Sequence, residues 1–162
     1  MEAKYQKKKL RQHIYDTPDT YAGGSDLIEE KLPILQDNKI IHKDISYVPA
    51  LFNIFNEILV NSRDHSVRLQ QLQDDHLVSI LKITINSETG EISIYNDGSG
   101  IDIVEHPSEK DSSGKSIMIP EMIFGHLLTS TNYDKDEKKI VGGKNGYGAK
   151  LTNIFSTTFT IE

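Results

Sequence analysis

The 162-residue sequence contains no cysteine, so disulfide bonds and thiolate metal sites are excluded. No apolar run approaches the length that crosses a membrane, and no signal-peptide pattern opens the chain. Positive charge is also scarce, because 18 Lys and Arg face 24 Asp and Glu, which gives a net charge of −6. This balance does not favour duplex DNA as a partner of this chain alone, since such binding neutralises phosphates. The length and the 36% of hydrophobic residues suit one domain or most of one.

Glycine is concentrated in one late stretch of the chain, at Gly142, Gly143, Gly146 and Gly148. Glycine lets backbone N–H groups crowd close to a ligand, because it has no side chain and reaches positive φ. Residues 151–155 are predicted to form a helix behind this stretch. The free N–H groups and the positive dipole end of such a helix point at the same place. The pattern predicts a phosphate-binding loop, and an ordinary flexible loop is the alternative.

The two common glycine-rich nucleotide motifs do not fit this stretch. A Walker A loop needs glycine directly before its lysine and Ser or Thr after it, whereas Lys150 lies between Ala149 and Leu151. The dinucleotide fingerprint needs a third glycine where this chain has Leu151. Any phosphate bound here is therefore held by a loop of another kind.

The clearest predicted helix starts at Pro49, which suits a first helical turn. Its apolar stripe repeats every three or four residues and consists of Leu51, Ile54, Phe55, Ile58 and Leu59. A polar stripe runs beside it and consists of Glu57, Asn61, Asp64 and Arg68. A carboxylate and an amide one turn apart, as at Glu57 and Asn61, can orient a water and ligate Mg²⁺. A solvated helix face is the alternative explanation.

A strand is predicted over residues 77–86, a hairpin turn over 87–90 and a return strand over 91–95. The return strand leads into Asn96-Asp-Gly-Ser-Gly-Ile101. An amide, a carboxylate and two glycines at a strand end are typical of a ligand-contacting loop. An ordinary Asp-Gly turn is the alternative.

Other segments carry simpler patterns. A helix is predicted over residues 6–15, an irregular segment over 26–48, a polar loop over 105–117, a short helix over 121–128 and a strand over 157–162. Residues 129–133 follow the short helix. Their hydroxyls and amide either cap the helix end or bind phosphate and ribose.

Three motifs occur in the order of the three nucleotide boxes of the GHKL (Bergerat) ATPases: Glu57-x-x-x-Asn61, Asn96-Asp-Gly-Ser-Gly-Ile101 and Gly142-Gly-Lys-Asn-Gly-Tyr-Gly-Ala-Lys150. Longer strings resemble the ATPase domain of type IIA DNA topoisomerases of the eukaryotic and viral kind: Glu57-Ile-Leu-Val-Asn61, Ile123-Phe-Gly-His-Leu-Leu-Thr-Ser130, Asn132-Tyr-Asp134 and residues 142–155. Residues 5–8 and 18–21 resemble the arm and first loop of that family. The resemblance covers nearly the whole chain and is weakest over residues 24–46.

The resemblance implies a role for each matching position. Glu57 would polarise the attacking water, Asn61 would ligate Mg²⁺, and Asn96 would contact adenine. The ribose and phosphate contacts would be Ser130, Thr131 and Asn132. The ATP lid would comprise Gly143, Lys144, Asn145, Gly146, Tyr147, Gly148, Ala149 and Lys150. Tyr5 would reach the nucleotide of a partner subunit. These are the parts that phosphoryl transfer needs, namely positioning, a metal and electrostatic cover.

Some positions depart from the family. Lys144 stands where arginine is usual, which removes bidentate contacts. His65 replaces an asparagine and is expected to alter the surroundings of the Mg²⁺. The loop over residues 107–116 is longer than usual and is expected to bulge at the surface. The family's domain also continues beyond the residue that matches Glu162.

The resemblance implies an α/β two-layer sandwich, with a mixed, largely antiparallel sheet and helices on one face. Residues 1–25 would form an arm and first helix, and residues 26–162 an incomplete GHKL ATPase domain. The implied function is the ATP-binding and ATP-hydrolysing gate of a type II topoisomerase, which passes one DNA duplex through another. The implied partners are ATP with Mg²⁺, a second subunit on closure, and DNA through further domains, without a membrane. A nuclear location is implied if the source is eukaryotic. The alternatives are another GHKL ATPase, of the mismatch-repair or chaperone type, and a nucleotide-binding module without hydrolysis.

Overall fold

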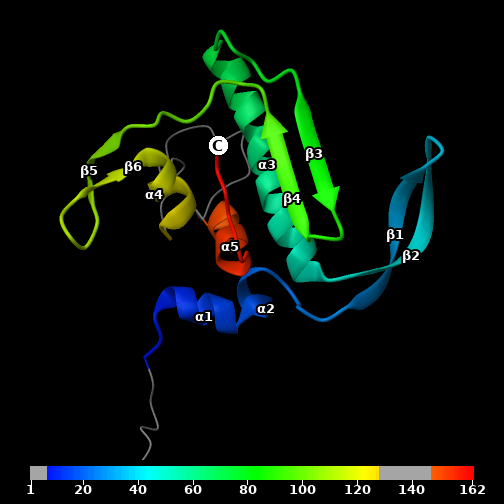
Figure 1. Ribbon diagram of the computed structural model, residues 1–162. Helices are drawn as coiled ribbons and strands as arrows, with labels where there is room; N and C mark the ends of the chain where they lie inside the picture. The colour runs from blue at the N-terminus through cyan, green and yellow to red at the C-terminus, as the bar shows by residue number, and fades with distance from the viewer. Residues whose placement is uncertain (1–6, 128–146) are drawn as a thin grey trace, which may run out of the picture. The chain divides into compact units, whose positions relative to one another are not determined.

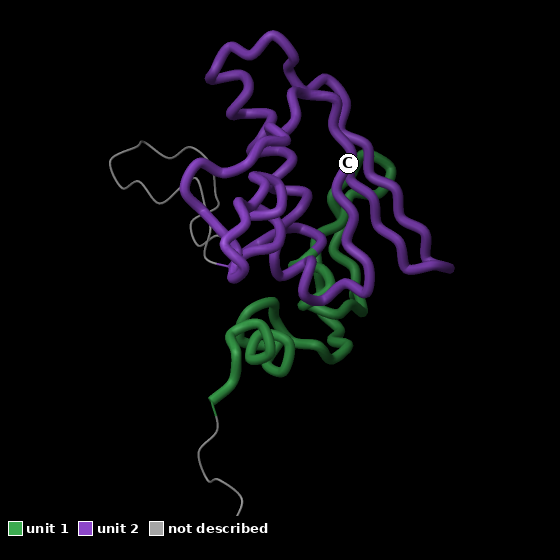
Figure 2. Tube along the Cα trace, turned by 60° about the vertical axis from the view of Figure 1, so that its left-hand side comes forward, with its two compact units in different colours: residues 1–54 green, residues 55–162 purple. Residues whose placement is uncertain are grey.

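The computed structural model describes residues 7–127 and 147–162 (Figure 1). The chain divides into two compact units, residues 1–54 and residues 55–162, which are coloured separately in Figure 2. The long helix α3 (Pro49–Leu72) begins in the first unit and continues into the second. No helix among residues 7–127 and 147–162 is both long and apolar enough to cross a membrane.

The first unit opens with two short helices, α1 (Leu10–Asp16) and α2 (Pro18–Tyr21). Pro18 is the first residue of α2, a position where the missing N–H costs nothing. Ile14 is fully buried and Ala22 is nearly so. The helix predicted over residues 6–15 is thus confirmed in its body and begins later than expected, at Leu10.

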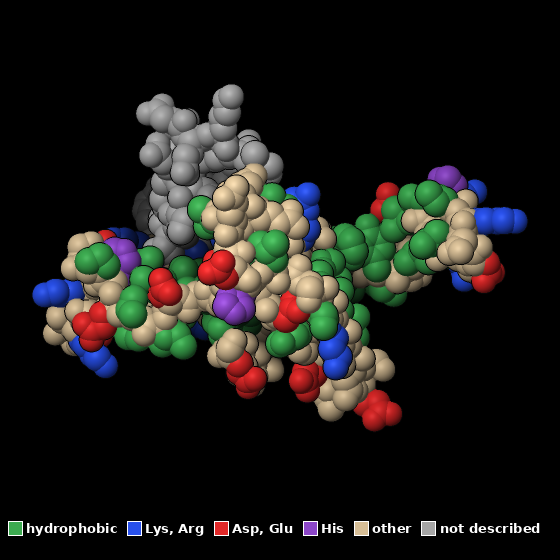
Figure 3. All heavy atoms as spheres, turned by 90° about the horizontal axis from the view of Figure 1, so that it is seen from above, with side chains coloured by type: hydrophobic (Ala, Val, Ile, Leu, Met, Phe, Trp, Pro, Cys, Tyr) green, Lys and Arg blue, Asp and Glu red, His purple; other side chains and the backbone are tan. Residues whose placement is uncertain are grey.

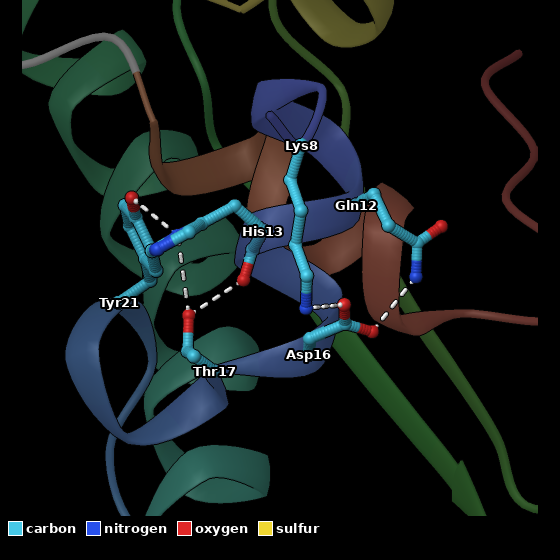
Figure 4. A network of polar contacts seen from close by, with 6 residues as sticks. All are labelled: Lys8, Gln12, His13, Asp16, Thr17 and Tyr21. Carbon is cyan, nitrogen blue, oxygen red and sulfur yellow. Dashed lines mark hydrogen bonds and ion pairs between the residues drawn. The ribbon is translucent and has the colours of Figure 1, made fainter. Parts of the chain in front are cut away.

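A polar network closes the end of α1, and Figure 4 shows its members: Lys8, Gln12, His13, Asp16, Thr17 and Tyr21. Asp16 accepts hydrogen bonds from Lys8 Nζ at 2.6 Å and from Gln12 Nε2 at 2.7 Å. The bond from Lys8, and then that from Gln12, lowers the pKa of Asp16. Thr17 Oγ1 donates to the His13 carbonyl oxygen at 2.5 Å, which satisfies a helix-end acceptor.

Residues 26–48 were predicted to be irregular, and this prediction is wrong. They contain an antiparallel hairpin of β1 (Ile28–Gln36) and β2 (Lys39–Tyr47), paired from Ile28↔Tyr47 to Gln36↔Lys39. Asp37 and Asn38 form its two-residue turn with φ of 51° and 57°, as a type I′ turn requires. Figure 3 shows hydrophobic and charged side chains mixed over this hairpin, and Leu35 and Ile40 are each 73% exposed.

The second unit holds the rest of α3 and two further hairpins. β3 (Leu81–Asn86) pairs antiparallel with β4 (Glu91–Asn96), as the sequence predicts, although β3 begins later than expected. β5 (Glu105–Lys110) pairs with β6 (Ser116–Met118), so the prediction of a polar loop over residues 105–117 is wrong. All strand pairs among the described residues are antiparallel and form two-stranded sheets.

The described residues of the second unit also form two short helices, α4 (Ile119–Gly125) and α5 (Gly148–Phe155). Asn153 Nδ2 on α5 donates to the Phe124 carbonyl oxygen at 3.0 Å, and the rings of Phe124 and Phe159 lie 6.2 Å apart. The buried apolar side chains of this unit are Leu69, Ile117, Ala149, Leu151 and Ile154. The strand predicted over residues 157–162 is absent from this described segment, so that prediction is wrong.

Candidate functional site

The central feature of the site is the contact between Glu57 and the start of α5. Glu57 lies on α3, and Gly148 is the first residue of α5. A Cβ atom added at Gly148 would collide with Glu57 Oε2 and would lie 3.1 Å from Glu57 Cδ. The carboxylate therefore lies directly against the backbone that opens α5. Residues 91 positions apart in the sequence meet here, at a helix end whose N–H groups attract negative charge.

This position changes the acidity of Glu57. Desolvation by burial raises the pKa of its carboxyl group. The residue as a whole remains exposed, so the desolvation falls on the carboxyl end that lies against α5. A raised pKa makes a carboxylate a stronger base, which suits a group that takes hydrogen bonds from an attacking water.

Asn61 lies one helical turn after Glu57 on α3 and is exposed. Its amide oxygen is a hard donor of the kind that Mg²⁺ accepts. The described residues contain no group of three or more His, Cys, Asp or Glu that could hold a metal ion by themselves. A single amide oxygen fits Mg²⁺ in a site where phosphate oxygens and waters supply most ligands.

The predicted adenine loop begins at the end of β4. Asn96 is half-buried, and its Oδ1 accepts a hydrogen bond from Gly98 N at 3.3 Å. This bond orients the Asn96 amide within the loop. An amide oxygen has two lone pairs, so one acceptor position on Oδ1 can still serve a ligand N–H.

Asp97 holds the same loop in place, a role that the sequence did not reveal. Its Oδ1 accepts hydrogen bonds from Ser79 N and Ile80 N, both at 2.8 Å, and its Oδ2 accepts one from Ser79 Oγ. The Ser79 side chain, and then the Ile80 amide, lowers the pKa of Asp97 to about 2. The carboxylate thus ties the end of β4 to the residues just before β3. Its partners lie 17 and 18 positions away, beyond the reach of any local motif.

Gly98 lets this loop pack directly on α3. A Cβ atom at Gly98 would lie 2.6 Å from Val78 Cγ2 and 2.7 Å from Leu69 Cδ1, closer than real side chains approach. Leu69 is a buried residue of α3. Glycine is therefore required here by the close approach of the backbone to the helix.

The described part of the predicted ATP lid is Tyr147 to Lys150, and it forms the N-cap and first turn of α5. Ala149 and Lys150 are buried, and Lys150 is only 6% exposed. Burial lowers the pKa of the Lys150 ammonium group. The rest of the predicted site lies outside the described residues: Tyr5, Ser130, Thr131, Asn132, Gly143, Lys144, Asn145 and Gly146.

Comparison with known proteins gives the family of the chain. No protein-family model matches it. DNA topoisomerase 2 of Acanthamoeba polyphaga mimivirus is 48% identical over 100% of this chain and 12% of its own length. DNA topoisomerase 2 of Caenorhabditis elegans is 49% identical over 98% of this chain and 10% of its own length. In the solved structures, the ATPase region of Saccharomyces cerevisiae topoisomerase II matches with a TM-score of 0.82 and 47% identity, over 95% of this chain and 38% of that one.

The chain is homologous to the ATPase region of DNA topoisomerase II. The ATPase and transducer domains of topoisomerase II from Balamuthia mandrillaris are also similar, with a TM-score of 0.81 and 42% identity over 94% of this chain and 36% of that one. These matches confirm the predicted fold class and family. The chain spans about a tenth of the length of the curated topoisomerases it matches.

Proposed function

We propose that this chain is the ATP-binding and ATP-hydrolysing gate of a type II DNA topoisomerase. The observation that carries the proposal is the Glu57 carboxylate lying against the first turn of α5. A base and a phosphate-attracting helix end are thereby brought together. The similarity to topoisomerase II ATPase regions supports the same assignment and argues against the mismatch-repair and chaperone types.

The proposed chemistry assigns one task to each group. Glu57 accepts a hydrogen bond and then a proton from a water, whose oxygen bonds to the γ-phosphorus as the bond to the ADP oxygen breaks and ADP leaves. The N–H groups at the start of α5 and the glycine loop before it stabilise the charge on the phosphate oxygens. Mg²⁺, when bound, neutralises part of the triphosphate charge, and Asn61 would be its protein ligand. Asn96 accepts from the exocyclic amine of adenine through its Oδ1.

Several further roles follow from the family and belong to the same proposal. The arm at residues 1–25, with Tyr5, would reach the nucleotide of a second subunit when two copies close. Residues 26–162 would form the ATPase domain itself. Ser130, Thr131 and Asn132 would contact ribose and phosphate. In the longer protein, closure of this gate would drive the passage of one DNA duplex through another.

The substitution Glu57→Gln tests the assignment, because it keeps the size of the side chain and removes the base. In a preparation that turns over ATP, phosphate release should fall by about 10²-fold or more, the usual scale for a lost base. The dissociation constant for ATP should stay within about twofold. Glu88→Gln, in the exposed turn between β3 and β4, is the matched control and should change neither quantity. Undiminished hydrolysis by Glu57→Gln would refute the role of Glu57, and no hydrolysis by the unaltered protein would favour a binding module.

A further inference from the structure

His65 makes a direct contact between α3 and the loop that contains Asn96. It lies on α3 one turn after Asn61 and two turns after Glu57. Its Nε2 atom is 2.6 Å from the Ser99 carbonyl oxygen. A carbonyl oxygen can only accept, so Nε2 carries the proton and donates. This short bond joins the helix with the base and metal ligand to the loop with the adenine contact.

Ser99 is also held from a second direction, by the residues that follow α3. Its backbone N–H donates to the His76 carbonyl oxygen at 3.0 Å, and its Oγ donates to Asp74 Oδ1 at 2.6 Å. Asp74 in turn accepts from His76 N at 2.8 Å. The hydrogen bond from the Ser99 hydroxyl, and then that from the His76 amide, lowers the pKa of Asp74. Its carboxylate is therefore ionised at neutral pH and accepts both bonds. Ser99 is thus fixed through its carbonyl, its amide and its hydroxyl.

These contacts determine where Asn96 lies. Asp97 anchors one side of the loop to Ser79 and Ile80, and Ser99 anchors the other side to His65. Between the two anchors, Gly98 packs on Leu69 and donates its N–H to Asn96 Oδ1. The orientation of the Asn96 amide therefore depends on both anchors, and the helix that carries Glu57 supplies the hydrogen bond at His65 as well as Leu69 beneath Gly98.

We propose that His65 is a positioning residue for adenine recognition, which acts through Ser99 on the Asn96 amide. The inference rests on the proposed function, because it gives Asn96 the role of reading the adenine amine. His65 holds the base-reading loop in register with Glu57 and Asn61, so that one helix, α3, places the adenine relative to the base and the Mg²⁺ ligand.

The test compares the affinities of the full chain for ATP and for GTP, both with Mg²⁺, by displacement of a fluorescent ATP analogue. GTP has a carbonyl where adenine has its amine, so it cannot donate to Asn96 Oδ1 and gains no hydrogen bond from the way that atom is aimed. His65→Ala should weaken ATP binding by about 3- to 10-fold, the usual effect of one lost hydrogen bond. Binding of GTP should change by less than about twofold. A role in folding alone would weaken both nucleotides equally and would overturn the inference.

Two further variants keep the test decisive if His65→Ala does not fold. His65→Gln places an amide N–H near the position of Nε2 and should restore the parent preference for ATP. His65→Leu keeps much of the bulk of the ring, has no donor for the Ser99 carbonyl, and should bind ATP as weakly as His65→Ala. If His65→Leu bound ATP as tightly as the parent chain, the inference would be overturned.

Asn96→Ala separates this inference from the proposed function. It should abolish the preference for ATP over GTP. Adding His65→Ala to Asn96→Ala should then weaken ATP binding no further, because His65 acts through Asn96. If Asn96→Ala leaves the preference intact, the adenine contact itself is wrong and both proposals fail. If Asn96→Ala removes the preference while His65→Ala does not reduce it, only the inference about His65 fails.

Discussion

Replacing Gly148 by alanine would test the contact between Glu57 and α5 without altering either polar group. The new Cβ atom would collide with Glu57 Oε2 and would lie 3.1 Å from Cδ and 3.5 Å from Cβ of the same side chain. The backbone of Gly148 has no positive φ, so alanine is compatible with its conformation. The Glu57 side chain must therefore rotate away from the start of α5.

The cost to folding should be small. A rotation of the Glu57 side chain away from its present conformer costs about 0.5–1.5 kcal/mol. Alanine is better than glycine in a helix by up to about 1 kcal/mol, which offsets most of that cost. The free energy of unfolding should therefore change by less than about 1 kcal/mol in either direction.

The effect on catalysis should be much larger, because a displacement of about 1 Å at a reacting group can reduce the rate by about 10²-fold. In a preparation that turns over ATP, steady-state phosphate release by Gly148→Ala should fall to that extent. The affinity for ATP should change little. Gly125→Ala, at the end of α4, is the matched control, because a Cβ atom there meets nothing within 4 Å.

Two results would refute this reasoning. Turnover within about twofold of the parent would show that the position of the Glu57 carboxylate at α5 does not matter for hydrolysis. A loss of ATP affinity as large as the loss of turnover would show that the added methyl group blocks the phosphate and not the base.

Three further predictions concern stability and its dependence on pH. The raised pKa of Glu57 means that its charged form is disfavoured in the folded state. Glu57→Gln should therefore raise the melting temperature at pH 7, and the gain should disappear as the pH falls below the pKa of an unfolded glutamate, about 4.3; an equal gain at pH 3 would contradict this. The pKa of Asp97 is lowered to about 2, so its stabilisation is complete above pH of about 4 and is lost as the pH falls towards 2. Asp97→Asn should thus destabilise the chain at pH 7 and flatten its acid unfolding curve over that interval. Gly98→Ala should lower stability by about 1–3 kcal/mol in urea unfolding, because its Cβ overlaps Leu69 and Val78; unchanged stability would show that the loop can move aside.

The sequence predicted α3 well, because helical periodicity is a local property; of its polar stripe Glu57, Asn61 and Arg68 are exposed, whereas Asp64 is buried. Glu57 and Asn61 one turn apart follow directly from that periodicity. The contact of Glu57 with Gly148 could not be predicted from spacing, since it joins positions 91 residues apart. The resemblance to the GHKL boxes placed both residues at one nucleotide site, and the structure adds how the carboxylate meets the helix.

The strands β1 and β2 were not predicted, because they are too exposed to show the alternation of apolar and polar residues that marks a strand. Most of β1 and β2 is exposed on both faces, so apolar and polar residues do not alternate, and Pro33 lies inside β1. The opposite error occurred at residues 157–162, whose threonines and isoleucine favour a strand although they pair with no described strand. Strand formation depends on a partner, which local propensity does not supply.

The contacts that hold the Asn96 loop in place were not predicted from the sequence for a different reason. Asp97 and Gly98 were expected to form a ligand loop or an ordinary turn, and the structure adds that Asp97 caps the entry to β3 and Gly98 packs on α3. His65 was expected to affect the surroundings of Mg²⁺, which stays a prediction, and its contact with the Ser99 carbonyl oxygen was not foreseen. Residue types suggested polar contacts here, but their partners depend on tertiary structure.

Glu57 and the start of α5 form one site, in which the helix N–H groups bind the reacting phosphate and the carboxylate orients the attacking water. A crystal structure with Mg²⁺ and a non-hydrolysable ATP analogue would test it most directly. We expect the γ-phosphate on the first N–H groups of α5 beside the Glu57 carboxylate, a water within hydrogen-bond distance of that carboxylate, and the adenine amine on Asn96 Oδ1. A triphosphate bound away from the start of α5, or a Glu57 carboxylate that no water bridges to the γ-phosphate, would contradict the claim.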